Sequence, residues 1–177
     1  MRRIRYAVGM SLDGYIAGPN DEADWIVIDD PKAATEYFKA FLAEFDTVVI
    51  GRRTWELLAR GSPEAEYPGL RTYVLSRTLA PTAYPKVTVL GDDGLATIAA
   101  LRETPGRDIW LFGGGFLFGS FAEAGLVDAV EVGIFPVLLG AGKPLLSGCA
   151  KRVNLELIDV QRNLIGCLGL RYAVRRG

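Results

Sequence analysis

The chain contains no histidine and only two cysteines, Cys149 and Cys167, among its 177 residues. Neither a disulfide framework nor the usual His and Cys ligand set of a zinc site can be assembled from so few of these residues. No metal site is therefore expected. A chain without a disulfide framework fits a reducing compartment, and we expect a cytoplasmic protein.

An excess of charge of one sign and long apolar runs are also missing. The formal net charge of −1 provides no sequence-wide basic field for a nucleic-acid backbone or an anionic membrane surface. No stretch approaches the ~20 apolar residues of a membrane-spanning helix, and the N-terminus has no apolar signal core. We expect a soluble, unexported protein whose partners include neither nucleic acid nor membrane.

The chain has the size and the apolar content, 50% of its residues, for a single domain over residues 1–177. Short apolar or alternating runs predict strands at residues 4–10, 47–50, 72–75, 87–90, 109–112 and 129–135. Helical spacing predicts helices between them, at residues 31–44, 53–59, 95–102 and 116–124. This alternation predicts a three-layer α/β/α domain around a mixed, mostly parallel sheet. The last two apolar runs, 155–160 and 166–174, are too close together for parallel pairing and predict a C-terminal antiparallel hairpin.

Three strand-to-helix turns have the chemistry of an anion site. Ligands of open α/β sheets bind beyond the carboxyl ends of the strands, where helix N-termini present free N–H groups. Gly51-Arg52-Arg53-Thr54 combines a residue without a side chain, two guanidinium groups and a hydroxyl. By itself this turn is equally well explained as a solvated helix start.

The second turn, Ser76-Arg77-Thr78, ends the next predicted strand and offers two hydroxyls and an arginine. Its arginine could form paired hydrogen bonds with a phosphate on the adenosine ribose, which favours NADP over NAD. Alone, an ordinary polar turn is the better explanation.

The third turn, Gly113-Gly114-Gly115, follows a strand that ends at Phe112 and opens a helix that begins with Phe116 and Leu117. Three consecutive glycines suggest a close approach of the backbone to something else, either a ligand or the packed chain itself. The spacing is not that of the G-x-G-x-x-G fingerprint, so a standard Rossmann site is disfavoured.

The order of these motifs resembles the dihydrofolate reductase superfamily. The resemblance extends nearly from end to end, and is stronger to the reductase half of the bifunctional deaminase-reductase of riboflavin biosynthesis and its stand-alone relatives. It rests on 11–17 (Ser-Leu-Asp-Gly-Tyr-Ile-Ala), the three turns, and 125–128 leading to 136–142. It implies a dihydrofolate reductase-like fold, an NADPH cofactor and a homodimer.

The resemblance also implies the roles of the turn residues. Gly114 and Gly115 would pass beneath the pyrophosphate, and the peptide that joins the first two glycines would be cis. The nicotinamide would lie against Gly9, Ile16 and Ala17. The full set of implied cofactor contacts is Gly9, Ile16, Ala17, Gly51, Arg52, Arg53, Thr54, Leu75, Ser76, Arg77, Phe112, Gly114, Gly115, Phe116 and Leu117.

Assignments on the substrate side are weaker. Trp25, Phe38 and Phe135 could form the walls of the pocket, and Lys143 could bind an anionic tail of the substrate. A core aromatic and a solvated loop lysine are the alternatives. No catalytic residue is assigned; Glu36 and Asp30 are weak candidates, better explained as a solvated helix residue and an N-cap.

The resemblance implies hydride transfer from NADPH to the carbon of a C=N unit. The most similar activity is that of a 5-amino-6-(5-phosphoribosylamino)uracil reductase. The predicted helix at 31–44 lacks a clear equivalent of the aspartate that dihydrofolate reductases place beside the pterin, since its register offers only Thr35 or Glu36. A pterin-type reductase of unknown substrate and a non-catalytic NADPH-binding protein remain alternatives.

Overall fold

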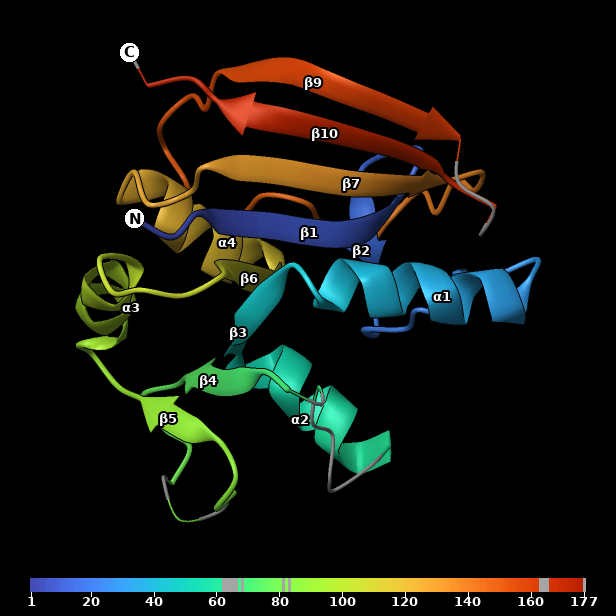
Figure 1. The fold of residues 1–177 in the computed structure, drawn as a ribbon. Helices are drawn as coiled ribbons and strands as arrows, with labels where there is room; N and C mark the ends of the chain where they lie inside the picture. Colours follow the sequence, from blue (N-terminus) through green and yellow to red (C-terminus); the bar gives the residue numbers. More distant parts are fainter. Residues whose placement is uncertain (62–66, 68, 81, 83, 163–165, 177) are drawn as a thin grey trace.

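The computed structural model describes residues 1–61, 67, 69–80, 82, 84–162 and 166–176. Its centre is an eight-stranded sheet in the order β5-β4-β3-β6-β1-β7-β10-β9 (Figure 1). The six strands from β5 to β7 pair in parallel, whereas β10 pairs with both β7 and β9 in antiparallel orientation. The predicted mixed, mostly parallel sheet with a C-terminal antiparallel hairpin is therefore confirmed.

The main elements agree with the predicted periodicities. The strands of the large sheet are β1 (Ile4–Ser11), β3 (Phe45–Gly51), β4 (Arg71–Leu75), β5 (Thr88–Leu90), β6 (Asp108–Gly113), β7 (Ala129–Phe135), β9 (Leu155–Arg162) and β10 (Leu168–Val174). The helices are α1 (Pro31–Leu42), α2 (Arg52–Gly61), α3 (Gly94–Arg102) and α4 (Gly115–Glu123). The predicted first helix ends at Leu42 rather than at residue 44, because the backbone then turns into β3.

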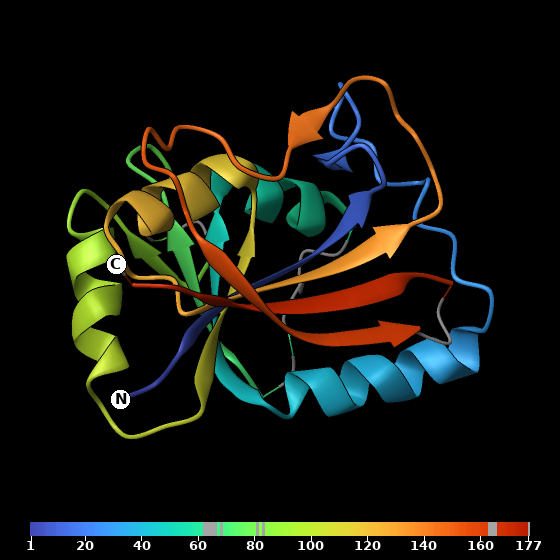
Figure 2. The same cartoon turned by 90° about the horizontal axis from the view of Figure 1, so that it is seen from above.

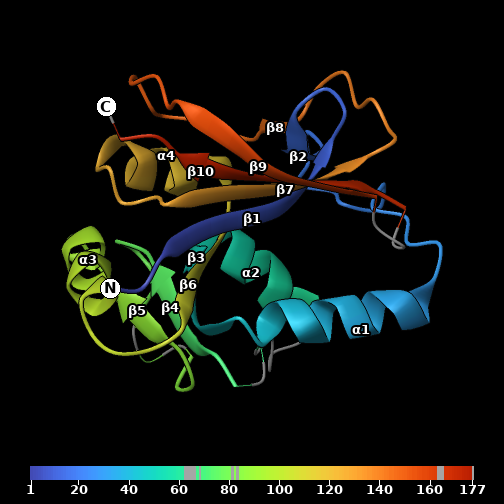
Figure 3. The ribbon, with the colours of Figure 1, turned by 45° about the horizontal axis from the view of Figure 1, so that its top comes forward.

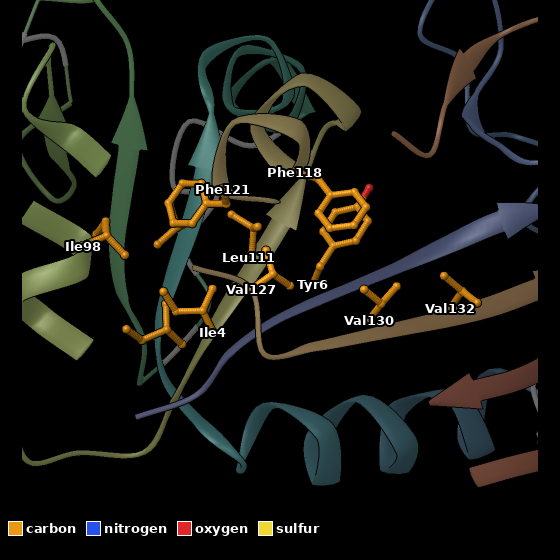
Figure 4. Close-up of a cluster of buried hydrophobic side chains, with 11 residues drawn as sticks. Ile4, Tyr6, Ile98, Leu111, Phe118, Phe121, Val127, Val130 and Val132 are labelled. Carbon is orange, nitrogen blue, oxygen red and sulfur yellow. The ribbon is translucent and has the colours of Figure 1, made fainter. Parts of the chain in front are cut away.

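Helices cover both faces of the sheet and make three layers (Figures 2 and 3). On one face, α3 and α4 pack Ile98, Phe118 and Phe121 onto the alternate strand residues that include Ile4 and Leu111 (Figure 4). The rings of Tyr6 and Phe118 stack there with centroids 4.0 Å apart.

The opposite face of the sheet carries α1 and α2. Phe41 of α1 and Trp55 of α2 belong to a second apolar cluster, which they form with Phe45, Val48 and Trp110 of the strands. Because side chains alternate across each strand, β3 and β6 contribute to both clusters.

A second, two-stranded sheet consists of β2 (Tyr15–Ala17) and β8 (Lys143–Pro144). Neither short strand was predicted, since the glycine-punctuated segments around them have no strand periodicity of their own. Asp13 connects the two segments, because its carboxylate accepts hydrogen bonds from the backbone N–H groups of Leu139 and Gly140. Within the described part of the chain, no helix combines the length and the apolar character that crossing a membrane requires.

Candidate functional site

The glycine-rich turns meet at the carboxyl ends of two adjacent strands. Since β3 pairs with β6 in parallel and Ile50 is in register with Gly113, the turns that follow these strands lie side by side. A Cβ added to Gly51 would lie only 3.4 Å from the carbonyl oxygen of Gly113. The Gly113–Gly114 peptide bond is cis, as the resemblance implied.

Gly114 is the point at which three segments converge. A Cβ added there would lie 3.8 Å from Oγ1 of Thr54 in α2 and 3.8 Å from Cδ1 of Ile16 in β2. Gly114 is also the N-cap of α4 and provides no capping side chain. The first turn of that helix therefore presents backbone N–H groups and a positive dipole end without a side-chain partner, as an anion site requires.

The arginines of these turns differ in their partners. Arg52 forms an ion pair with Glu56 in the same helix, at 2.9 Å. Arg53 and Arg77 are exposed, and neither forms an ion pair with any residue that the structure describes. The hydroxyl of Ser76 accepts hydrogen bonds from the N–H groups of Thr78 and Leu79 and so shapes its own turn. Arg53 and Arg77 thus have no described carboxylate to compete with an anionic ligand.

Other glycines of the third turn approach the chain itself. A Cβ on Gly115 would lie 2.3 Å from the carbonyl oxygen of Pro144, and one on Gly119 would lie 1.8 Å from that of Ser147. For these two glycines, tight packing of the chain is sufficient explanation. Of the next predicted contacts, Phe116 is 73% exposed, and Leu117 places its Cβ 3.7 Å from the added Cβ of Gly51.

An aromatic cavity of about 350 Å³ lies on the sheet face that α1 covers. Gly9 of β1 lies in its wall, where an added Cβ would be 3.2 Å from the ring of Phe135. The other rings of the lining come from α1, β6 and the segment before β4: Tyr37, Phe38, Phe41, Tyr67, Trp110 and Phe112. The cavity has the size and the apolar character of a small-molecule site.

The far side of the cavity carries a row of charged side chains across three strands. Arg171 of β10 is in register with Glu131 of β7 on one side and with Asp159 of β9 on the other. Nε of Arg171 lies 3.6 Å from the Glu131 carboxylate. Arg5, whose side chain is only 2% exposed, donates to both oxygens of Glu131, at 2.6 and 2.9 Å.

Two tyrosines of the cavity remain protonated at neutral pH. Burial raises the pKa of Tyr67 to about 12, and burial also raises the pKa of Tyr37. Their hydroxyl groups are therefore hydrogen-bond donors in the lining.

The predicted substrate residues divide between the cavity and its surroundings. Phe38 and Phe135 line the cavity. Trp25 packs edge-on against Phe135, with centroids 6.0 Å apart, and its indole N–H donates to the carbonyl of Glu22. Nζ of Lys143 instead donates to the carbonyl of Pro19 at 2.8 Å, so this lysine connects β8 to the loop after β2.

The weak catalytic candidates lie outside the cavity lining. Asp30 is the N-cap of α1 and accepts from the N–H groups of Lys32 and Ala33, whereas Glu36 is exposed on that helix. The carboxylates that do line the cavity, Glu131 and Asp159, were not singled out from the sequence. A signal was present for Glu131, because a lone acid within an otherwise apolar strand requires a buried partner.

No group of three or more His, Cys, Asp or Glu side chains that could hold a metal ion occurs in the described residues. The sequence contains no histidine, and the carboxylates of the cavity face arginines instead.

Comparison with known proteins identifies the family. The family model of the RibD C-terminal domain matches residues 2–164. The uncharacterized protein YyaP of Bacillus subtilis is 33% identical over 97% of this chain and 94% of its own length. The riboflavin biosynthesis protein RibD of Corynebacterium ammoniagenes is 31% identical over 77% of this chain, which spans only 44% of that protein.

Solved structures share the whole fold. A putative riboflavin biosynthesis protein from Shewanella sp. PV-4 superimposes with a TM-score of 0.84 at 26% identity, over 98% of this chain and 99% of its own. Dihydrofolate reductase from Enterococcus faecalis, solved in complex with NADP(H), has a TM-score of 0.66 at 16% identity, over 98% of this chain and 97% of its own, and so shares the dihydrofolate reductase-like fold. The chain belongs to the RibD C-terminal domain family.

Proposed function

We propose that this protein is an NADPH-dependent reductase that transfers a hydride to the carbon of a C=N unit in a pyrimidine-type substrate. One observation carries the proposal. Glycines and the exposed Arg53 and Arg77 follow the ends of adjacent strands, and Gly9 lies in the wall of an aromatic cavity on the same sheet.

This edge of the sheet fits a phosphorylated dinucleotide. Gly114 lies beside the N-terminus of α4, and a Cβ added to it would meet its nearest neighbours, Thr54 and Ile16, at 3.8 Å. The pyrophosphate would lie there, and the exposed guanidinium group of Arg77 would bind the phosphate on the adenosine ribose. Ile16, Ala17 and Gly9 would lie towards the nicotinamide.

The bound cofactor would supply the hydride, and this chain would supply orientation and a dry site. The aromatic lining, 350 Å³ in volume, would hold a flat ring against Gly9 and exclude water. The substrate nitrogen takes up a proton as its carbon accepts the hydride. Glu131 and Asp159 would orient the substrate by accepting hydrogen bonds from its ring N–H groups.

The reference reaction is reduction of 5-amino-6-(5-phosphoribosylamino)uracil. We expect the purified protein to transfer deuterium from NADPH that carries deuterium at both C4 positions of the nicotinamide to the product of an aminouracil of this type, as detected by mass spectrometry. Transfer of deuterium from NADPH would support the proposal. An unlabelled product, or no product despite bound NADPH, would count against it.

No specific observation favours the pterin alternative, because Thr35 and Glu36 on α1 both lie outside the cavity lining. A non-catalytic NADPH-binding protein would be indicated by tight cofactor binding without turnover of any aminouracil. The cytoplasm, which maintains NADPH, is the compartment that this proposal requires.

A further inference from the structure

The charged row of the cavity contains two carboxylates and only one cation, Arg171. Arg171 lies between two carboxylates in one cross-strand row, Glu131 on β7 and Asp159 on β9. Neighbours in such a row have their side chains on the same face of the sheet and within reach of each other. Nε of Arg171 lies 3.6 Å from the Glu131 carboxylate, so the charge of Arg171 is offset within the row before any ligand enters.

Arg5, behind the row, is compensated in the same way. Its guanidinium group donates to both oxygens of Glu131 and also to Glu44 at 2.5 Å and Asp108 at 3.3 Å. Burial alone would lower the pKa of Arg5, but these hydrogen bonds outweigh it and raise the pKa above its ordinary value. This side chain is fixed in place and is not free to bind a ligand.

The structure describes every lysine and arginine of the chain, so all the cations around the cavity can be identified. All 20 Lys and Arg residues lie in the described part of the chain, since the remaining residues include neither type. Arg171 is the one member of this set that lines the cavity. A phosphate dianion placed there would meet two carboxylates and a single arginine that already pairs with one of them, so its desolvation would be poorly compensated.

The cofactor edge shows the opposite arrangement. Arg53 and Arg77 are exposed, and no carboxylate of the described chain pairs with either. The two halves of the site thus differ in kind: free guanidinium groups at the strand ends, and compensated ones in the aromatic cavity.

We propose that the substrate is an uncharged compound without a phosphoryl group, whose planar heterocycle with ring N–H groups is held between the aromatic walls and the Glu131–Arg171–Asp159 row. This inference rests on the proposed function for its chemistry, but it concerns binding and is testable without turnover. It separates this chain from a reductase that recognises its substrate by a ribose phosphate.

The test compares two ligands that differ only in a phosphate group. Trp110 lines the cavity, so its fluorescence reports occupancy when 5-amino-6-(ribosylamino)uracil or its 5′-phosphate is titrated into the full chain. Calorimetry provides a second reading, and kcat/KM for NADPH oxidation is measured with both compounds. We expect the dissociation constant of the riboside to be lower than that of its phosphate by about tenfold or more. The value of kcat/KM should favour the riboside by a similar factor.

Two charge-reversal variants locate the effect. Asp159→Lys places a cation in the row and should raise affinity for the phosphorylated compound about tenfold. Glu156→Lys is the matched control, because Glu156 lies on the same strand, outside the cavity lining, and the substitution changes the net charge equally. It should leave the preference unchanged.

Each outcome has one meaning. Preferential binding of the riboside without turnover would support the inference and contradict the proposed function. Equal or tighter binding of the phosphate, or binding of neither compound, would overturn the inference. If Lys39→Ala alone abolished phosphate binding, the anion would lie in the neighbouring groove that Lys39 and Arg107 line, and the inference would again be wrong.

Discussion

Individual charged side chains distinguish the two halves of the site. Arg77, exposed at the end of β4, is expected to bind the phosphate that NADPH has and NADH lacks. We predict that Arg77→Ala weakens NADPH binding by about tenfold or more, about 1.4 kcal/mol, and hardly changes NADH binding. Fluorescence titration checks this. Arg175→Ala is the control, because Arg175 pairs with Glu156 and belongs to none of the three turns. An equal loss for both cofactors would show that Arg77 does not bind the ribose phosphate.

The carboxylate of Glu131 accepts two hydrogen bonds from the buried guanidinium group of Arg5. We predict that Glu131→Gln lowers the free energy of unfolding by roughly 1–3 kcal/mol, because Arg5 loses a charged acceptor where it cannot regain water. Urea denaturation measures the loss. Glu156→Gln, which breaks the exposed pair with Arg175, should cost less than about 1 kcal/mol. Equal costs would contradict this account of the Glu131–Arg5 contact.

Asp108 makes stability depend on pH. Burial alone would raise the pKa of Asp108, but hydrogen bonds from Arg3 and Arg5 outweigh burial and lower the pKa. A carboxylate whose folded pKa lies below its unfolded value stabilises the fold above the unfolded pKa, near 4, and loses that contribution as the pH falls towards the folded pKa. We predict a urea midpoint that falls between about pH 5 and pH 3, less steeply in Asp108→Asn. Exposed Asp92→Asn is the control, and an unchanged slope in Asp108→Asn would refute the assignment.

At the scale of elements, the contact between α4 and the segment from Pro144 to Gly148 fixes the third turn. A Cβ on Gly119 would lie 1.8 Å from the carbonyl oxygen of Ser147, so one backbone must move. We predict that Gly119→Ala lowers the free energy of unfolding by about 1–3 kcal/mol. Gly91→Ala, where no atom lies within 4 Å, should change it by less than about 0.5 kcal/mol. Similar values for both variants in urea denaturation would show that the contact is not tight.

The elements could be predicted from the sequence to the extent that their signals are local. Buried parallel strands such as β3 and helices such as α1 have apolar periodicity of their own, and the turns after strands follow from the alternation. The pair β2–β8 could not be predicted, because it depends on a contact between residues more than a hundred positions apart. The row of Glu131, Arg171 and Asp159 likewise depends on the register of three strands, which no local pattern specifies.

On the scale of the whole molecule, the edge of the sheet has an apolar surface. Leu155, Leu157, Ile158 and Val160 of β9, with Leu168 of β10, are 40–57% exposed. The expected homodimer would cover this surface. We predict that the double variant Leu157→Lys and Val160→Lys sediments as a monomer under conditions in which the unchanged chain sediments as a dimer. Leu138→Lys, at a site 69% exposed elsewhere, should have no effect. A monomeric unchanged chain would refute the prediction.

The proposed function requires that NADPH bind across both parts of the site, from the anion-binding edge to the aromatic cavity. Trp55, directly after Thr54, and Trp110, in the cavity wall, make intrinsic fluorescence a reporter for both parts. The most direct measurement is a titration of the unmodified protein with NADPH and, separately, with NADH. The structure predicts saturable quenching by NADPH with a dissociation constant at least about tenfold below that for NADH, whereas equal affinities or no binding of NADPH would contradict it.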